Sequence, residues 1–381
     1  MRNRLIYLLK HNVLAQNLYR FFGTIILKFV GLFVRTDHNL VVFISLMGTR
    51  FNDSPRSIYE YMMTHEEYKH YKMVWAFEHP EDYPEIPSVR IDTPRFFVTA
   101  LKAGYWISST QFERGLAYKK KKTKYLYTAH GAAIKLCGND CPGRKDFDYR
   151  RVDYLCVESE YDKYVFKRAF KAREESFLEV GRPCNDILWS VSDEQKQGLK
   201  RKMDLPQDKK VILYAPTWRD SRNGGKSYDI KPPIDLEKWE KRLSDDYIVL
   251  FRAHHITTKV MDVQFNSFLR NYSDYPEINE LYIVSDILIT DYSSVMVDYA
   301  ILERPILCFA YDYDEYLKER GTYFDLEKEL PNKPCRTQDE LLNIIETIDF
   351  ENQKTKTIAF KEKYDQYGGK GVQLSVKAMF G

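Results

Sequence analysis

Short apolar runs that alternate with helical stretches constrain the fold of this chain more than any other feature. After residue 38, runs rich in β-branched and aromatic residues predict strands at residues 40–46, 71–77, 105–109, 124–128 and 152–157. Residues 57–63 and 94–102, which lie between these runs, predict helices. Strands without strict polar alternation suit a sheet that is covered on both faces. The pattern therefore predicts an α/β fold built on a parallel sheet.

A polar stretch at residues 192–210 separates this half of the chain from a second series of the same kind. The second series predicts strands at residues 211–215, 247–251, 281–283, 287–290 and 306–309, and helices at 294–302 and 337–348. A chain of 381 residues is too long for one compact core. We expect two doubly wound domains that face each other across a cleft, at residues 37–191 and 192–381, with a C-terminal helix able to pack back on the first domain.

Residues 1–36 differ from the rest of the chain because they hold six basic residues and no acidic residue. The run at residues 21–34 contains a single charged side chain, Lys28, and its 14 residues fall short of the ~20 that a membrane-spanning helix needs. No small-residue cleavage site follows it. We expect an amphipathic helix that lies on an anionic membrane surface. The alternative is an ordinary helix docked on the protein's own surface.

The sharpest local signal is a buried run that ends in two serines. The strand predicted at residues 287–290 stops at Asp291, and Ser293 and Ser294 then open a helix. Serine at a helix start satisfies N–H groups that have no partner in the helix, and those groups favour an anion. Plain helix capping is the alternative. The position at the carboxyl end of a strand in an α/β domain favours a phosphate site.

Basic residues follow two other predicted strands of the second half. Thr217 and Arg219 come after its first strand, and Arg252 and His254 come after its second. We expect all four to lie at the same sheet edge as Ser293, because ligands of such sheets bind at the carboxyl ends of strands. Arginine suits bidentate contact with phosphate, and histidine can donate to a phosphate or act as an acid. Together these residues predict a site for a nucleoside diphosphate. The net charge of the chain, +3, is too small for a protein that binds nucleic acid.

In the first half, His130 follows a predicted strand and precedes Gly131. Glycine lets the backbone turn sharply or approach a ligand closely. A single histidine is more often structural than catalytic, but a position across the cleft from the phosphate cluster favours a general base. Lys135 would add charge to the same acceptor-side rim. No Asp-x-Asp-type metal motif stands out in the sequence, so we predict no cofactor, and metal independence is a hypothesis.

These motifs resemble, in their order along the chain, those of the CDP-glycerol glycerophosphotransferases of teichoic-acid synthesis. The resemblance runs from about residue 40 to the glycine-rich stretch near the end, and its motifs are His130-Gly131 with Lys135 and Gly138, and residues 181–186, 214–219, 252–254, 290–294, 303–305 and 320–325. It implies a GT-B-like fold and a peripheral protein on the cytoplasmic face of the membrane. It also implies transfer of a polyol phosphate from a CDP-polyol with release of CMP.

The resemblance also implies roles for single residues. His130 would be the base, and His254 would contact the donor phosphates. Asp291, Ser293 and Ser294 would make further contacts with these phosphates. Glu303 would hold the ribose, by a looser analogy with nucleotide-sugar enzymes.

Two positions depart from the family pattern and leave the substrates open. Residues 132–134 are Ala-Ala-Ile where Thr-Pro-Leu is common, and His255 follows His254 where proline is usual. The first expectation is transfer from CDP-glycerol to a hydroxyl of a lipid-linked acceptor. The alternatives are a CDP-ribitol-dependent ribitolphosphotransferase, a GT-B nucleotide-sugar glycosyltransferase and a membrane-bound scaffold without turnover.

Overall fold

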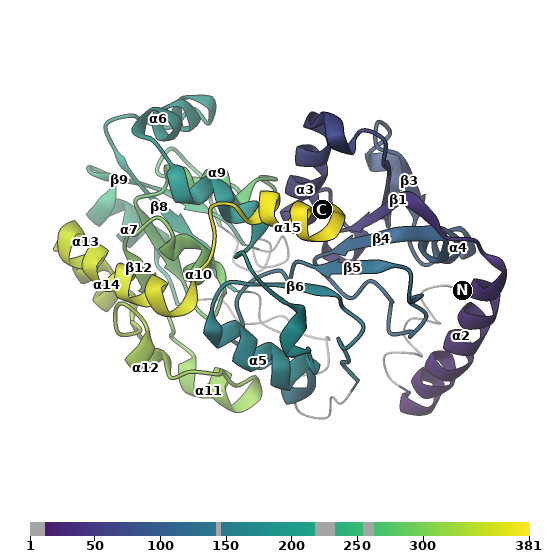
Figure 1. Cartoon of the computed structure of the whole chain (residues 1–381). Helices are drawn as coiled ribbons and strands as arrows, with labels where there is room; N and C mark the ends of the chain where they lie inside the picture. Colours follow the sequence, from purple (N-terminus) through teal and green to yellow (C-terminus); the bar gives the residue numbers. More distant parts are fainter. Residues whose placement is uncertain (1–11, 142–145, 218–232, 254–262) are drawn as a thin grey trace.

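Two parallel sheets form the framework of the protein, seen in a computed structural model that describes residues 12–141, 146–217, 233–253 and 263–381. The first sheet has seven strands in the order β3-β2-β1-β4-β5-β6-β7, and the second has five in the order β10-β9-β8-β11-β12. Every described pair of neighbouring strands is parallel. Figure 1 shows the sheets in separate halves, each with helices around it. The expected α/β fold with parallel sheets is confirmed.

The strands follow the predicted runs closely, except for three short strands at sheet edges. The first sheet contains β1 (Asp37–Ile44), β2 (Lys72–Phe77), β3 (Ser88–Arg90), β4 (Ala103–Ser108), β5 (Lys124–Tyr127), β6 (Tyr154–Val157) and β7 (Phe177–Glu179). The second contains β8 (Lys210–Tyr214), β9 (Tyr247–Phe251), β10 (Leu269–Asn271), β11 (Ile287–Thr290) and β12 (Ile306–Cys308). The edge strands β3, β7 and β10 have three residues each, too few to show a hydrophobic period.

Helices cover both sheets. In the first half these are α2 (Val13–Phe33), α3 (Asp53–Thr64), α4 (Pro94–Lys102) and α5 (Glu160–Phe170). Those that follow are α6 (Asp193–Lys202), α7 (Leu236–Leu243), α9 (Ile278–Val284), α10 (Val295–Ala300), α11 (Tyr313–Glu319), α12 (Leu326–Glu329), α13 (Gln338–Glu346), α14 (Phe350–Tyr364) and α15 (Gly371–Phe380). Between β7 and α6, residues Pro183–Ser190 form the 3₁₀ segment η6.

The prediction of a strand at residues 281–283 is wrong, because this segment lies in helix α9. Leu281, Tyr282, Ile283 and Val284 are all buried, so their side chains show neither the period of a strand nor that of a helix. The helix ends at Ser285, whose hydroxyl donates a hydrogen bond of 2.6 Å to the carbonyl oxygen of Leu281.

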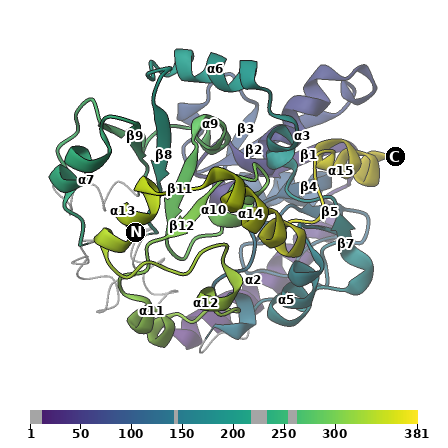
Figure 2. The same cartoon turned by 90° about the vertical axis from the view of Figure 1, so that its left-hand side faces the viewer.

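The last helix of the chain returns to the first half. Val376 and Met379 of α15 belong to the same buried cluster as Val41 and Phe43 of β1. Figure 2 shows α14 beside α10 of the second half and α15 beside the strands of the first. The chain therefore crosses between the halves twice, once through η6 and once before α15.

The two crossings pack against each other. The Asp186 carboxylate in η6 accepts hydrogen bonds of 2.8 Å from the backbone N–H groups of Gly371 and Val372. Gly368 lies so close to the Trp189 ring that a side chain there would collide with it. These contacts join the two halves near the middle of the molecule.

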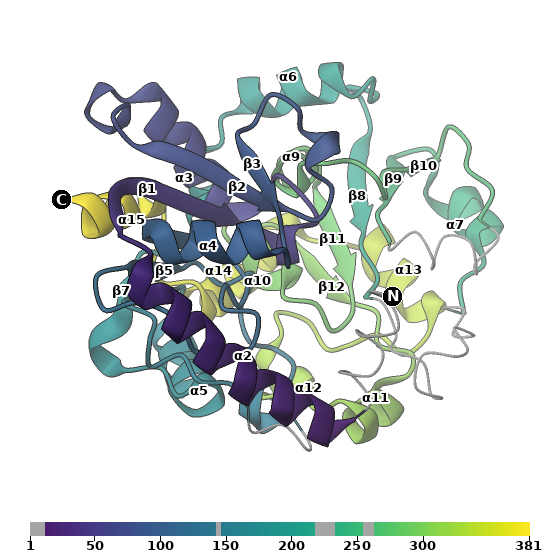
Figure 3. The same cartoon turned by 90° about the vertical axis from the view of Figure 1, so that its right-hand side faces the viewer.

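Helix α2 lies along the outside of the first half, below α4 in Figure 3. One face docks on the protein, where Leu27 and Val30 pack against the buried cluster of this half. The other face leaves large apolar side chains in solvent, with exposures of 61% for Phe21 and 78% for Leu32. Among the described residues, no helix has both the length and the apolar composition that crossing a membrane requires.

Candidate active site

His130 lies just beyond the end of β5, at the carboxyl edge of the first sheet. Its Nδ1 is 2.9 Å from the backbone carbonyl oxygen of Ser109. A carbonyl oxygen can only accept, so Nδ1 donates and the neutral ring keeps a lone pair on Nε2. The side chain is exposed. This arrangement presents Nε2 as a proton acceptor.

The backbone turns sharply on both sides of the histidine. Ala129 has φ = 54° and Gly131 has φ = 133°, a region that favours glycine. A Cβ atom on Gly131 would lie 2.4 Å from the Ser294 hydroxyl oxygen, which is closer than real contacts allow. Glycine therefore lets the His130 turn touch the start of α10. This contact joins the carboxyl edges of the two sheets.

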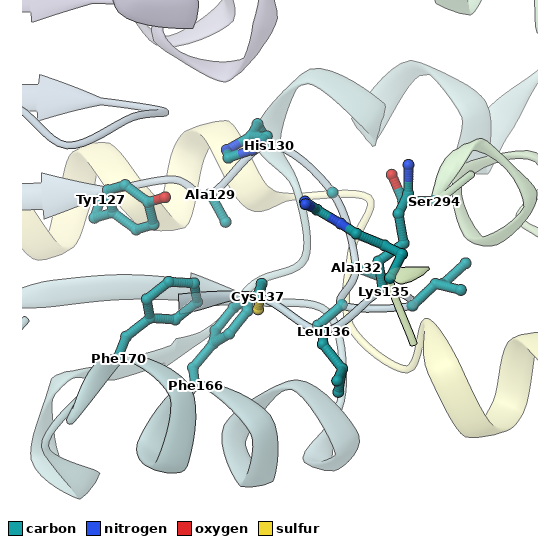
Figure 4. A pocket seen from close by; sticks show the side chains of 14 residues that line it. Tyr127, Ala129, His130, Ala132, Lys135, Leu136, Cys137, Phe166, Phe170 and Ser294 are labelled. Carbon is teal, nitrogen blue, oxygen red and sulfur yellow. The ribbon is translucent and has the colours of Figure 1, made fainter. Parts of the chain in front are cut away.

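Two cavities meet at His130. The first has a volume of about 290 Å³ and is lined by residues of both halves, among them Lys135 and Ser294 (Figure 4). Arg320 lines it as well. The second has about 740 Å³, shares His130 and Arg320, and extends along the first half to Thr110 and Tyr149. A base at this junction can reach groups held in either cavity.

Arg320 lines both cavities and is not among the site residues that the sequence predicts. It follows helix α11 rather than a strand, so a search for charges at strand ends does not find it. Its neighbours Gly321 and Tyr323 exchange backbone hydrogen bonds with Leu136 and Ile134, at 3.3 Å and 2.9 Å. This pairing carries Arg320 of the second half to the loop that follows His130. Its presence in the motif at residues 320–325 was the available signal.

Strand ends of the second sheet bring other predicted residues together. Tyr214 of β8 is in register with Phe251 of β9 and with Ile289 of β11, so Thr217, Arg252 and Asp291 follow strands that end at one edge. The Thr217 N–H donates to Asp291 Oδ1 at 2.9 Å, and the Tyr292 N–H donates to the same oxygen at 2.7 Å. The buried Asp291 carboxylate thus joins the loops after β8 and β11.

Arg252 is held by the loop that follows β10. Its Nη1 donates to the carbonyl oxygens of Tyr272 and Tyr275, at 3.3 Å and 2.5 Å. Burial lowers the pKa of Arg252 from its ordinary value. The guanidinium therefore orders this sheet edge, and its contact with a phosphate stays a prediction.

The start of α10 carries Ser293 and Ser294, which are both partly exposed. The Ser293 hydroxyl oxygen accepts a long hydrogen bond of 3.4 Å from the N–H of Val295. Ser294 occupies the N-cap position, but its side chain makes no capping hydrogen bond. The helix has six residues, so hydroxyl and N–H groups here can serve an anion better than a helix dipole can.

Three predicted site residues do not add to this arrangement. Arg219 and His254 lie outside the described residues. Glu303 lies just before β12 and pairs with Lys361 of α14. Because β12 runs parallel to β11, this position faces the edge opposite Ser294. The placement does not support a ribose contact for Glu303.

Comparison with known proteins adds a family to this geometry. Residues 26–376 match the model of the CDP-Glycerol:Poly(glycerophosphate) glycerophosphotransferase family. The chain belongs to this family. The match includes both sheets and every described residue of the two cavities, so the site lies within the part that defines these glycerophosphotransferases.

Individual glycerophosphotransferases are similar along most of the chain. It is 35% identical to the teichoic acid glycerol-phosphate transferase of Staphylococcus aureus over 82% of this chain and 85% of that protein. It is 36% identical to the teichoic acid poly(glycerol phosphate) polymerase of Bacillus subtilis, over 86% of this chain and 46% of the longer relative. A structure of a variant of the wall teichoic acid polymerase TagF soaked with CDPG superimposes with a TM-score of 0.79, at 32% identity over 90% of each chain.

These findings confirm the family resemblance seen in the sequence. They also confirm the class of enzyme, a CDP-glycerol-dependent glycerophosphotransferase of teichoic-acid synthesis.

Proposed function

We propose that this glycerophosphotransferase moves glycerol phosphate from CDP-glycerol to a hydroxyl of a lipid-linked acceptor and releases CMP. The observation that carries the proposal is the placement of His130. Its ring is oriented by the Ser109 carbonyl and lines a cavity that Ser294 of the other half also lines, and the adjacent Gly131 touches Ser294. A base at this point can take a proton from an acceptor held by one half and face a donor held by the other.

In the proposed reaction, the acceptor oxygen attacks the β-phosphorus of CDP-glycerol. His130 Nε2 takes the proton of the attacking hydroxyl as the new oxygen–phosphorus bond forms. The bond between the β-phosphorus and the bridging oxygen breaks, and CMP leaves with that electron pair. Transfer of this kind depends mainly on positioning and on stabilisation of charge.

The residues around the smaller cavity suit that charge. Lys135 and Arg320 line it together with Ser294, so cations and a hydroxyl surround one space. Charge-assisted hydrogen bonds to phosphate are stronger than neutral ones. We assign Ser293, Ser294 and the loops of Thr217, Arg252 and Asp291 to the donor side. Arg219 and His254 stay predicted donor contacts.

We assign residues 37–191 to the acceptor and residues 192–381 to the donor. The larger cavity supports the first assignment, because its wall belongs mostly to the first half and includes His130. The sheet edge with Thr217, Arg252 and Asp291 supports the second.

We assign residues 1–36 to the surface of an anionic membrane at the cytoplasmic face. Helix α2 docks by one face and exposes Phe21, Phe22, Ile25 and Phe29 on the rest of its surface. Arg20 pairs with Asp146 of the first half at 2.6 Å, which orients the helix on the protein. An exposed apolar face in a segment without acidic residues suits the boundary between headgroups and acyl chains.

A comparison of donors tests the reaction. The purified protein is incubated in parallel with CDP-glycerol, CDP-ribitol and a UDP-sugar, with a bacterial membrane extract as acceptor, and the lipid products are weighed by mass spectrometry. We expect CMP release and the mass of glycerol phosphate only with CDP-glycerol. Ribitol phosphate in the product would identify the ribitol enzyme instead, and UDP release would identify a glycosyltransferase.

A further inference from the structure

Arg182 forms a buried ion-pair network between the two halves of the molecule. Its Nη1 donates to both carboxylate oxygens of Asp298 at 2.7 Å, and its Nη2 donates to Asp53 Oδ1 at 2.9 Å. The side-chain exposures are 11% for Arg182, 5% for Asp298 and 6% for Asp53. Asn185 adds a hydrogen bond of 2.7 Å to Asp298. One guanidinium thus holds a helix from each half.

The Asp298 arm of the network leads to the donor side. Asp298 lies in α10, and its N–H bonds to the carbonyl oxygen of Ser294 one turn earlier, at 3.4 Å. The Val297 N–H bonds to the same oxygen at 2.9 Å. Since α10 is a single short helix, anchoring Asp298 also fixes Ser294, which touches Gly131.

The Asp53 arm leads to the acceptor side. Asp53 begins α3 with φ = 62°, and the preceding loop returns to β1 through a hydrogen bond of 2.7 Å from the Ser45 hydroxyl to Asn52. The next residue of that loop, Leu46, donates its N–H to the Ser109 hydroxyl at 3.3 Å. Ser109 is the residue whose carbonyl orients His130.

The electrostatics link Asp53 with the same histidine. Burial raises the pKa of Asp53, but Arg182, the backbone N–H of Ser54 and His130 together outweigh this effect, so the pKa is lowered overall. The His130 ring therefore lies within electrostatic reach of the network.

Stability alone does not account for a pair of this kind. Removing charges from water is costly, and well-packed apolar side chains of similar volume often stabilise a protein equally well or better. A guanidinium, by contrast, presents several donors in one rigid plane and can set the angle between two carboxylates. The network is therefore suited to fixing the relative position of helices α3 and α10.

We propose that Arg182 is a positioning residue that sets the distance and orientation between His130 and the donor-phosphate groups at the start of α10. The inference rests on the proposed roles of His130 and Ser294 in transfer from CDP-glycerol. It adds that their alignment depends on a residue in the crossing between the halves, which itself lines neither cavity.

The test compares Arg182→Lys with Arg304→Lys in the full-length protein. Arg304 is a suitable control because it also donates to several groups, the carbonyl oxygens of Tyr282, Ile283 and Ser285, but lies toward the opposite edge of the second sheet. For each variant we measure kcat, KM for CDP-glycerol, donor affinity by calorimetry and Tm. Arg182→Lys keeps the positive charge but loses the planar guanidinium that donates to two carboxylates at once.

For Arg182→Lys we expect kcat to fall about 100-fold, the cost of misplacing reactive groups by roughly 1 Å. KM and donor affinity should change little, and Arg304→Lys should keep the wild-type kcat at a similar loss of Tm. A wild-type kcat in Arg182→Lys would overturn the inference. A kcat loss that merely follows Tm in both variants would overturn it as well.

A double-mutant cycle with Asp298→Asn gives a second measurement. If Arg182 acts through α10, the double variant should lose no more kcat than the more affected single variant, because contacting residues in one network are not additive. Independent, multiplying losses would contradict the proposed link. The wild-type protein is assayed in parallel. A wild type that transfers no glycerol phosphate would refute the proposed function. An active wild type together with an unaffected Arg182→Lys variant would refute only this inference.

Discussion

At the scale of single residues, His130 is the group on which the proposed chemistry depends. Its replacement by alanine removes the proposed base and should leave the two sheets intact, because the side chain is exposed and makes its hydrogen bond to one carbonyl oxygen. We expect His130→Ala to lower kcat about 10²- to 10⁴-fold, the usual contribution of a general base. Donor affinity by calorimetry should stay close to that of the wild type. Near-normal turnover would show that His130 is not the base and that another residue takes the proton.

Gly131 is the residue that permits contact between the halves. In Gly131→Ala, the new Cβ must displace Ser294 and the backbone must hold φ = 133°, at a cost of about 1–3 kcal/mol. We expect a lower Tm and a large loss of transfer. Gly115→Ala is the matched control, since φ is 82° there and a Cβ would meet only Arg20 at 3.8 Å. Equal effects on transfer in the two variants would contradict a specific role of the Gly131 contact.

At the scale of elements, the start of α10 carries the proposed donor contacts. The double substitution Ser293→Ala with Ser294→Ala should weaken CDP-glycerol binding by about 10- to 100-fold, which corresponds to one charge-assisted hydrogen bond of about 1.5–3 kcal/mol. Calorimetry measures the change. Ser192→Ala is the control, because this serine caps α6 far along the chain from the site. Unchanged affinity in the double variant would place the nucleotide away from this helix start.

Helix α2 is the element that we assign to the membrane. A variant with four substitutions removes exposed apolar surface and leaves the docking face with Leu27 unchanged. The substitutions are Phe21→Ser, Phe22→Ser, Ile25→Ser and Phe29→Ser. In vesicle flotation, the wild type should bind anionic vesicles and be partly released by high salt, since each basic residue near the surface contributes about 1 kcal/mol. The variant should stay in the soluble fraction. Equal binding of the wild type to neutral vesicles would contradict the electrostatic contribution.

At the scale of the whole molecule, buried carboxylates around the crossings couple stability to pH. Burial raises the pKa of Asp162 to about 7. Burial and neighbouring carboxylates also raise the pKa values of Glu158 and Asp365 well above the ordinary range. A carboxyl with a higher pKa in the folded state binds a proton on folding, so its stabilising effect is present at acid pH and is lost as the pH rises toward 7.

Asp162→Asn tests this coupling. The wild type should lose Tm between pH 5 and pH 8, and the variant should narrow that loss by about 3–6 °C, because its amide does not titrate. Asp193→Asn, at an exposed position at the start of α6, should keep the wild-type difference. An Asp162→Asn variant with the full wild-type difference would show that this carboxylate is ionised in the folded protein at acid pH.

Much of the fold was predictable because it depends on local sequence. The residues of β9 and β11 and of helix α4 lie where the apolar runs predict them, since buried parallel strands need continuous apolar runs and α4 begins at Pro94 with Thr93 as its cap. The prediction of a strand at residues 281–283 was wrong, because a helix that is buried on all sides has the same apolar composition as a buried strand.

The site was predictable only in part. Strand-end residues such as His130, Thr217 and Asp291 could be found, because the carboxyl ends of parallel strands share an edge. Arg320 and Arg182 could not be found in this way. Arg320 reaches the site through pairing of distant loops, and the side chain of Arg182 makes its hydrogen bonds to residues more than 100 positions away along the chain.

The sequence by itself determined the class of fold, the family and the residue types available for the chemistry, because periodicity and motif spacing are local properties. The tertiary structure decided which of these residues meet. In the folded chain the His130 turn touches Ser294, Glu303 lies toward the opposite sheet edge, and Arg182 lies between two helices. These outcomes depend on how the two sheets pack through their crossings, and that packing is set by contacts between residues far apart in the chain.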